Sequence, residues 1–424
     1  MDTASKYKIP ADYYILLCIC TFMAIWAFFL DSPSQILNGI IKINTSRSVL
    51  VSDYVALGGI GAALLNAAMG GLFYLTLLII YKIKPTGKII LALFLTIGFS
   101  LFGKNLFNML PIFFGVWLYA IFNKEKISRH LAHAMVSGTV GPIVSEIAFL
   151  HDDTSFLRII AACAAGLFIG FIFPIIMEAA KRMHRGFCLY NGGIAGGFIA
   201  TFFVGILASL GIEIVPEEFW DTDHTVILAR FAFALGAALV IWGFVKDHPL
   251  TAIKKYWLLQ KESDETDNDY LVKYGNSTYI NIGVLCIITT SLMMFLNIPI
   301  NGPVLGGILT VTGFGAAGKH LRSTLPVLIG SMAAAHLNFF DVGYSNNSLA
   351  ILFSTGLAPI AGKFGFIPGI VVGFVHVSIA IIVGNLNGGM NLYNNGFAGG
   401  FVAITTVPII IFLKDFRQNR KLEK

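Results

Sequence analysis

The sequence predicts an all-α polytopic membrane protein, and two observations carry that prediction: the composition and an internal duplication. Of the 424 residues, 56% are hydrophobic and 12% are charged, against roughly 25% charged in an average soluble domain. A soluble core could not absorb so much apolar surface, so lipid must be the solvent for most of the chain. The net charge of +6 does not indicate a nucleic-acid partner, because the basic residues lie between apolar runs.

Apolar stretches recur along the whole chain. The first of them, 13–30, is long enough to span a bilayer and is followed by no cleavage site, so we interpret it as a membrane segment rather than a signal peptide. The stretches run over 13–30, 54–82, 88–104, 105–122, 131–150, 155–179, 188–212, 226–245, 276–297, 301–318, 323–340, 346–362, 366–388 and 392–413.

Basic residues predict the orientation. If the N-terminus is inside and every stretch crosses, 24 of the 29 Lys and Arg residues fall on the inner side. Cytoplasmic loops retain Lys and Arg, so both termini are expected in the cytoplasm and the protein in the cytoplasmic (inner) membrane. The only long hydrophilic stretch, from Asp247 to Asn276, is expected to be a solvated loop between two halves of the chain.

The two halves of the sequence repeat. Residues 189–200 (LYNGGIAGGFIA) recur at 392–403 (LYNNGFAGGFVA), with nine of 12 positions identical. Further matches follow in the same order along both halves. They join Gly103-Lys104 to Gly318-Lys319, Leu110-Pro111 to Leu325-Pro326, and Ser137 with Pro142 to Ser354 with Pro359. Several ordered blocks of this kind indicate a duplicated membrane unit.

The number of stretches predicts how the halves are related. Each half holds seven, so the second begins on the opposite face and the repeats are inverted, as in many secondary transporters. If 88–104 and 105–122 form a re-entrant hairpin, each half has five spanning segments and the inversion remains; both counts fit the sequence. We place the first repeat at 1–212. The stretch 213–278 then includes segment 226–245, the first of repeat two, and the loop 246–275, and 279–424 completes the second repeat.

Lys104 and Lys319 are the most informative charges, because each half supplies one after a glycine. One interpretation is a lysine at a helix end that snorkels to the headgroups. The other places both ammonium groups at membrane depth, facing a polar cavity that attracts an anionic or carbonyl-bearing solute.

The repeated blocks supply the other candidate substrate-binding residues. Glycine, asparagine and proline in these blocks indicate either close helix packing or broken helices whose free backbone groups line a cavity. The candidates are Tyr190, Tyr393, Asn191, Asn394, Asn395, Gly193, Gly396, Ser137, Thr139, Ser354 and Thr355.

Four ionisable residues within apolar runs are candidates for proton coupling: Glu146, Arg230, His336 and His376. A buried histidine can relay protons, although one that is simply hydrogen-bonded inside the protein is the commoner case. The five cysteines lie in apolar segments without other ligand-type residues, so we expect them to pack rather than to bind metal.

Catalysis is the rival class, and the sequence does not favour it. There is no HExxH zinc helix, no phosphate-binding glycine loop with Lys-Ser/Thr, and no paired aspartate-rich loop. We therefore expect neither an enzyme nor a cofactor or metal.

The twin Leu-Tyr-Asn and Gly-Lys blocks resemble an uncharacterised family of duplicated bacterial integral membrane proteins, a domain of unknown function. The blocks at Leu189-Tyr190-Asn191 and Leu392-Tyr393-Asn394 are also loosely similar to segments of urea transporters, without that family's Asn-Pro pore motifs. The first resemblance implies no activity, and the second implies a related fold but not the substrate.

Together these observations predict secondary transport of a small polar or anionic solute through a midplane site. The alternatives are a facilitative urea-type channel, a membrane-embedded enzyme and a sensory or structural membrane protein. The expected partners are the lipid bilayer, the solute and, as an option, further copies of the chain.

Overall fold

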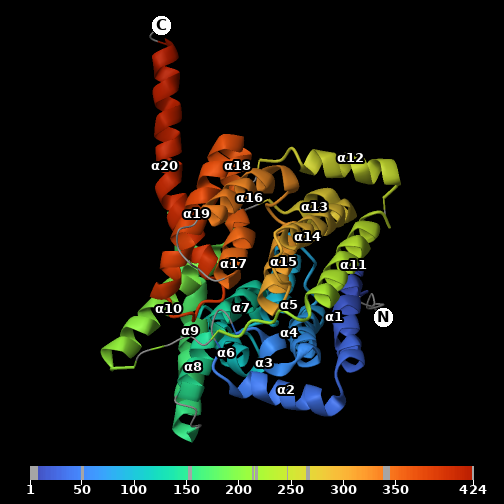
Figure 1. Ribbon diagram of the computed structural model, residues 1–424, viewed down its shortest axis with the longest axis vertical. Helices are drawn as coiled ribbons and strands as arrows, with labels where there is room; N and C mark the ends of the chain where they lie inside the picture. The colour runs from blue at the N-terminus through green and yellow to red at the C-terminus, as the bar shows by residue number, and fades with distance from the viewer. Residues whose placement is uncertain are drawn as a thin grey trace, which may run out of the picture.

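The computed structural model describes residues 8–48, 52–150, 155–212, 214, 218–245, 247–263, 268–337 and 344–422, and this part of the chain folds into helices (Figure 1). The predicted all-α polytopic class is confirmed. Large apolar side chains cover the outside: Phe29, Phe122 and Phe295 are 78–82% exposed. Polar side chains such as Asn66 and Lys104 are buried. This distribution suits a protein whose surface meets lipid.

The α-helices form two series in the same order, and among the described residues the 3-10 helices η1 and η4 each occur in one series only. The first series is α1 (Ala11–Leu30), α2 (Pro33–Thr45), α3 (Tyr54–Gly58), α4 (Ile60–Ile80), α5 (Gly87–Phe99), α6 (Leu106–Phe122), η1 (Ile127–Arg129), α7 (Leu131–Ser137), η2 (Gly138–Val140), α8 (Gly141–Phe149), α9 (Phe156–Met183) and α10 (Asn191–Ser209). The second is α11 (Thr225–Gly243), α12 (Pro249–Leu259), α13 (Tyr270–Tyr274), η4 (Gly275–Ser277), α14 (Thr278–Phe295), α15 (Gly302–Phe314), α16 (Leu321–His336), α17 (Tyr344–Ser354), η5 (Thr355–Leu357), α18 (Ala358–Phe364), α19 (Phe366–Leu386) and α20 (Asn394–Leu422). Helix α15 lies 215 residues after α5 at both ends, and α20 begins 203 residues after α10.

Eight described helices are long and apolar enough to cross a membrane, four in each series: α1, α4, α9 and α10, and α11, α14, α19 and α20. Stretch 131–150 is a helix broken by the 3-10 turn η2, and its counterpart is broken by η5. Helix α5 has 13 residues, about 20 Å, which is short of a hydrocarbon core of about 30 Å. These lengths favour five spanning segments and one hairpin in each half over seven full spans.

Two expected loops contain helices instead. Helix α2 lies between the first two apolar stretches and begins with a Ser32–Gln35 capping box and Pro33. Helix α12, with Pro249 in its first turn, occupies part of the loop predicted at 246–275. These start signals are visible in the sequence, but neither helix is a long apolar run, so neither was predicted. The acidic residues Asp264, Glu265 and Asp267 of that loop lie outside the described residues.

Helices α5 and α15 pack against each other through reciprocal contacts. A Cβ atom on Gly98 would lie 2.8 Å from the carbonyl oxygen of Gly306, and one on Gly313 would lie 3.2 Å from that of Leu91. Gly313 matches Gly98 and Gly306 matches Leu91 at the same offset of 215. The contact between Gly98 and Gly306 is therefore repeated between their counterparts, Gly313 and Leu91. Reciprocal contacts of this kind are made by two units that are related by a twofold axis.

Carboxylates at the starts of α3 and α13 make a second pair of reciprocal contacts between the halves. Asp53, which caps α3, accepts a hydrogen bond of 3.2 Å from the backbone N–H of Gly302 at the start of α15. Asp269, which caps α13, accepts one of 2.8 Å from the N–H of Gly87 at the start of α5. Each half therefore supplies a carboxyl oxygen that accepts a free N–H group at the start of a helix of the other half, α15 or α5.

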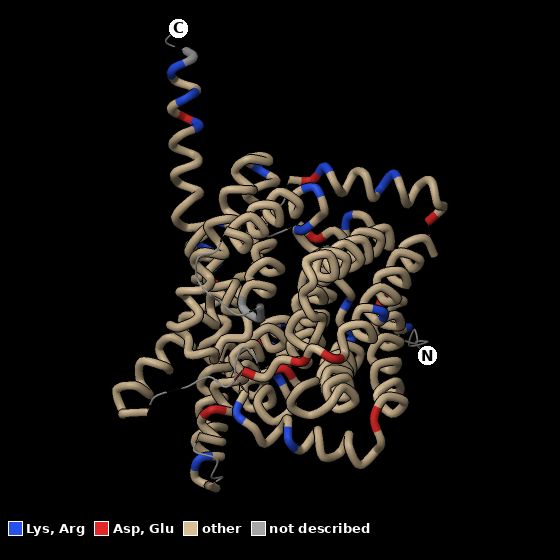
Figure 2. Tube along the Cα trace, viewed as in Figure 1, with Lys and Arg blue, Asp and Glu red and all other residues tan. Residues whose placement is uncertain are grey.

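Helices α2 and α12 lie at opposite ends of the molecule (Figure 1), and basic residues gather on α12 and on the end of α20 (Figure 2). Lys42 on α2 and Lys254 on α12 are both exposed. If the repeats are inverted in the membrane, these two positions lie on opposite faces.

In a chain whose five cysteines are replaced by serine, we expect Lys42→Cys and Lys254→Cys to react with a membrane-impermeant maleimide from opposite sides. Labelling in intact cells reports the outer face of the membrane, and labelling in inverted vesicles reports the inner face. Because parallel repeats would place both positions on one face, labelling of both from the same side would contradict the inverted arrangement.

Candidate functional site

The tip of each α5–α6 and α15–α16 hairpin is fixed by a buried asparagine from a neighbouring long helix. Asn66 on α4 donates from Nδ2 to the carbonyl oxygens of Ser100 (2.7 Å) and Lys104 (2.9 Å). Asn281 on α14 donates in the same way to Gly315 and Lys319, at 2.9 Å each. Neither asparagine is among the site residues predicted from the sequence, although they stand 215 residues apart, as the lysines do.

Glycine is required just before each lysine. Gly103 and Gly318 have φ angles of +71° and +81°, in the left-handed region that favours glycine. At Gly103 a Cβ atom would also lie 2.2 Å from the side chain of Leu392, in the other half. The Gly-Lys pair therefore marks a tight turn, and both lysine side chains are fully buried.

The Lys319 side chain contacts residues of both halves. Its Nζ donates to the Tyr190 hydroxyl at 2.7 Å and to Thr355 Oγ1 at 2.8 Å. The same nitrogen lies 4.8 Å from the centre of the Tyr190 ring and 4.9 Å from that of Phe314. Tyr190 is in the first half and Thr355 in the second, so the ammonium group connects the two.

The Lys104 amine is bound within the first half alone. It donates to the Met135 carbonyl oxygen at 2.9 Å and to Thr96 Oγ1 at 3.2 Å. The position that matches Thr355 is Gly138, where a Cβ atom would lie 2.8 Å from the Lys104 Nζ. No carboxylate of the described residues lies within ion-pair distance of this amine. The two matched lysines therefore have different surroundings.

The unwound segments before α10 and α20 are bonded across the halves. The Leu189 N–H donates to the Gly356 carbonyl oxygen at 2.9 Å, and the Leu392 N–H donates to that of Thr139 at 3.0 Å. Leu392 matches Leu189, and Gly356 matches Thr139. The 3-10 turns η2 and η5 thus receive backbone groups of the opposite half.

Ser137 and Ser354 do not take part in this exchange, since their hydroxyls bond to carbonyl oxygens of their own helices, those of Ala134 and Ile351.

Helices α10 and α20 cross next to these segments. A Cβ atom on Gly193 would lie 2.7 Å from the Cα of Gly396, so the two backbones touch. The rings of Tyr190 and Tyr393 are 4.7 Å apart. Phe314 flanks the first tyrosine at 4.8 Å and Phe99 flanks the second at 5.3 Å. The repeated Leu-Tyr-Asn blocks therefore meet at the interface between the halves.

Asn191 and Asn394 bond within their own halves. Asn191 Oδ1 lies 2.6 Å from the His184 Nε2, and Asn394 Oδ1 accepts from Asn387 Nδ2 at 2.8 Å. His184 and Asn387 are matched positions. Each pair anchors the first turn of α10 or α20 to the end of the preceding long helix.

The matched positions differ most at His376 and Asn395. Both are buried, and Asn395 lies beside the His376 ring. Among the described residues, neither ring nitrogen of His376 nor Oδ1 of Asn395 has a hydrogen-bond partner. The counterparts in the first half are Phe173 and Gly192, which carry no polar side-chain atom. The nearby Tyr393 hydroxyl and Asn387 Oδ1 also lack partners in the described part of the chain.

The other three proton-coupling candidates lie elsewhere. Glu146 is buried and forms an ion pair with Arg47, with Nη2 and Oε2 2.9 Å apart. Arg230 and His336 are exposed on α11 and α16. Of the four, only His376 lies beside the contact between α10 and α20.

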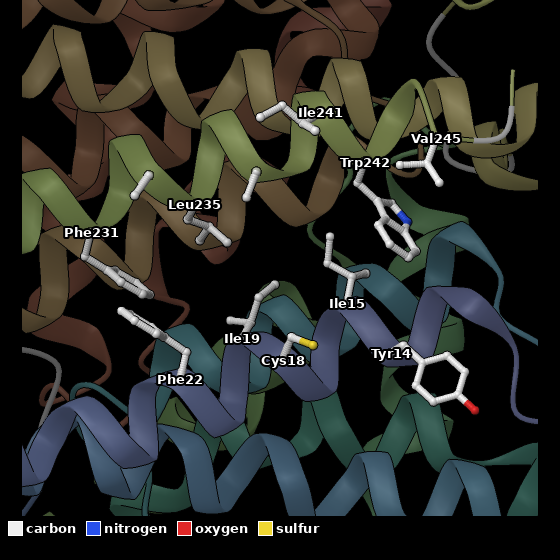
Figure 3. Close-up of a pocket in the computed structure, with 12 residues that line it drawn as sticks. Tyr14, Ile15, Cys18, Ile19, Phe22, Phe231, Leu235, Ile241, Trp242 and Val245 are labelled. Carbon is white, nitrogen blue, oxygen red and sulfur yellow. The ribbon is translucent and has the colours of Figure 1, made fainter. Parts of the chain in front are cut away.

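A groove of about 520 Å³ lies between α1 and α11 (Figure 3), and its lining is apolar, unlike the polar groups at the interface of the halves. The rings of Phe22 and Phe231 stack across it at 6.2 Å. Apart from Tyr14, Cys18 and Trp242, its lining side chains are purely hydrocarbon. It offers no charge to recognise a polar solute.

Comparison with known proteins identifies one matching protein family. A family model described as "Protein of unknown function (DUF1576)" matches residues 32–209 and 248–412. The matched segments run from α2 to α10 and from α12 to α20. No curated protein and no solved structure matches the chain. The likeness to urea transporters and a bacterial source stay predictions from the sequence.

Gly193 and Gly205 on α10 provide a matched test of the crossing between α10 and α20. We expect Gly193→Leu to lower the melting temperature in detergent or to abolish a monodisperse peak, because overpacking costs about 1–3 kcal/mol. Gly205→Leu should behave as the wild type, since a Cβ atom there meets nothing within 4 Å. Equal stability of the two variants would show that the crossing is loosely packed.

Proposed function

The chain belongs to the DUF1576 family, whose function is unknown, and from that premise we propose that it is a secondary transporter of a small anionic or polar solute. The solute binds between the two halves, next to the crossing of α10 and α20. No catalysis, cofactor or metal is part of the proposal.

The architecture supports transport. Halves related by a twofold axis, with broken helices at their interface, are the recurring design of secondary transporters. In that design the substrate site lies at the interface, because unwound backbone is tolerated at membrane depth only where protein or water receives it. The breaks at η2, η5 and before α10 and α20 meet this condition.

The observation that carries the proposal is the Lys319 ammonium group. It is fully buried and bound to hydroxyls of both halves. A buried ammonium group donates hydrogen bonds and attracts electron-rich groups. A carboxylate or another electron-rich group of a solute would bind to it at the interface of the halves, which favours an anionic substrate.

A transport cycle follows from the same contacts. The Lys319–Tyr190 bond joins the halves, so a rocking motion of one half against the other must break it. A solute that accepts the ammonium's hydrogen bond replaces Tyr190 at that moment. The hydroxyl of Tyr393 and the amide of Asn395 then offer further hydrogen bonds to the same solute.

The proposed setting is the inner membrane, with both termini in the cytoplasm. The bias of basic residues toward one side of the membrane supports it. A facilitative channel is the alternative function, and a gradient separates the two: only a coupled transporter moves solute against its own concentration difference.

Lys319→Gln tests the site, with Lys104→Gln as its matched control. In proteoliposomes given labelled acetate, lactate, succinate, urea or alanine, we expect saturable uptake of at least one solute. Lys319→Gln should lower that uptake at least tenfold, because it removes the positive charge that attracts the solute.

Lys104→Gln should retain most of the uptake, since its amine is bound within one half. Melting temperatures of both variants show that they fold. Equal uptake by Lys319→Gln and the wild type would contradict the proposed site, and loss of uptake in both variants would place the solute between the two lysines.

His376 is the proposed proton-coupling group, and the first half supplies the variant that tests it. The double variant His376→Phe with Asn395→Gly reproduces the Phe173–Gly192 pair. We expect acid outside the vesicle to raise the initial uptake rate of the wild type several-fold and to leave the double variant unchanged. A retained response to pH in the double variant would assign the coupling to another group.

A further inference from the structure

A second groove, of about 850 Å³, lies between the start of α19 and the distal part of α20. Phe366, Ile367 and Val371 line one wall, and Ile409 and Leu413 line the other. These apolar side chains are exposed, Ile367 by 73% and Leu413 by 50%. Unlike the groove between α1 and α11, this one has a basic end.

The α20 wall changes from apolar to basic along a single face. Thr406, Ile410, Lys414 and Arg417 line the groove and recur at intervals of three or four residues, the spacing of one helical face. Residues 407–413 are uncharged and the chain becomes strongly polar from Lys414 onward. The hydrocarbon boundary of a bilayer therefore falls near Leu413, and the two basic residues lie at headgroup level.

The first half has no equivalent of this basic end. The positions that match Lys414 and Arg417, 203 residues earlier, are Gly211 and Ile214, which follow the end of α10. The basic end is therefore a property of the second half, and the duplication does not account for it.

We propose that this groove binds one anionic phospholipid. Its acyl chains lie along Ile367, Val371 and Ile409, and its phosphate accepts hydrogen bonds from Lys414 and Arg417. The charge pattern selects this occupant: hydrocarbon walls suit acyl chains, while two cations at headgroup level favour a negative headgroup. The proposal is independent of the transported solute.

The test uses full-length protein in nanodiscs of phosphatidylcholine alone or with one-fifth phosphatidylglycerol. Lipid that remains bound after transfer to detergent is identified by native mass spectrometry. We expect the wild type to retain one phosphatidylglycerol. Lys414→Gln with Arg417→Gln should weaken retention about 30-fold, the equivalent of two basic residues at about 1 kcal/mol each.

The matched control is Arg420→Gln with Lys421→Gln, which removes the same charge from α20 beyond the groove. It should retain phosphatidylglycerol as the wild type does. Equal loss in both variants would show bulk attraction to the helix end rather than a site. Retention of phosphatidylcholine and phosphatidylglycerol in proportion to their supply would also overturn the proposal. So would a dimer, measured by light scattering, that dissociates when Ile367→Asp or Leu413→Asp is introduced, because a second copy would then fill the groove.

Discussion

Backbone groups that are freed inside a membrane must find a partner within the protein, and this constraint determines how the two halves fit together. The chain unwinds before α10 and α20, and the exposed N–H groups of Leu189 and Leu392 bond to η5 and η2 of the opposite half. Asp53 and Asp269 accept hydrogen bonds from the first N–H groups of α15 and α5 in the same reciprocal way. Neither half can satisfy its own backbone, so the two depend on each other.

The twofold relation determines how the two halves pack, and the residues that differ between matched positions provide the candidate functional groups. Lys104 and Lys319 occupy matched hairpin tips, but only Lys319 reaches across to the other half, where its amine donates to Tyr190 while also donating to Thr355 of its own half. Likewise the apolar pair Phe173–Gly192 is replaced by His376–Asn395 in the second half. Unpartnered buried polar groups are costly. Next to the crossing of α10 and α20, the described residues His376, Asn387, Tyr393 and Asn395 of the second half carry such atoms, which supports a function there rather than a packing role.

The same asymmetry extends to the surface that meets lipid. Both series end in a long helix, but α20 continues into a basic segment while α10 does not. An anionic lipid held against α19 and α20 would bear on helices that carry His376 and Asn395 toward the centre. The bound lipid and the interior site would then share the same two helices, α19 and α20.

The sequence alone determined the membrane class, the duplication and the importance of the Gly-Lys and Leu-Tyr-Asn blocks, because composition and repeated motifs are local properties of the chain. It left open whether the 88–122 region crosses the membrane, and it missed helices α2 and α12. Only the tertiary structure decided that Lys319 contacts Tyr190 and that Glu146 pairs with Arg47. It also decided that the side chains of Arg230 and His336 are exposed on the surface of the protein. These contacts and exposures depend on which side of each helix faces the twofold axis. In helices that are apolar nearly all round, hydrophobic periodicity does not reveal that face.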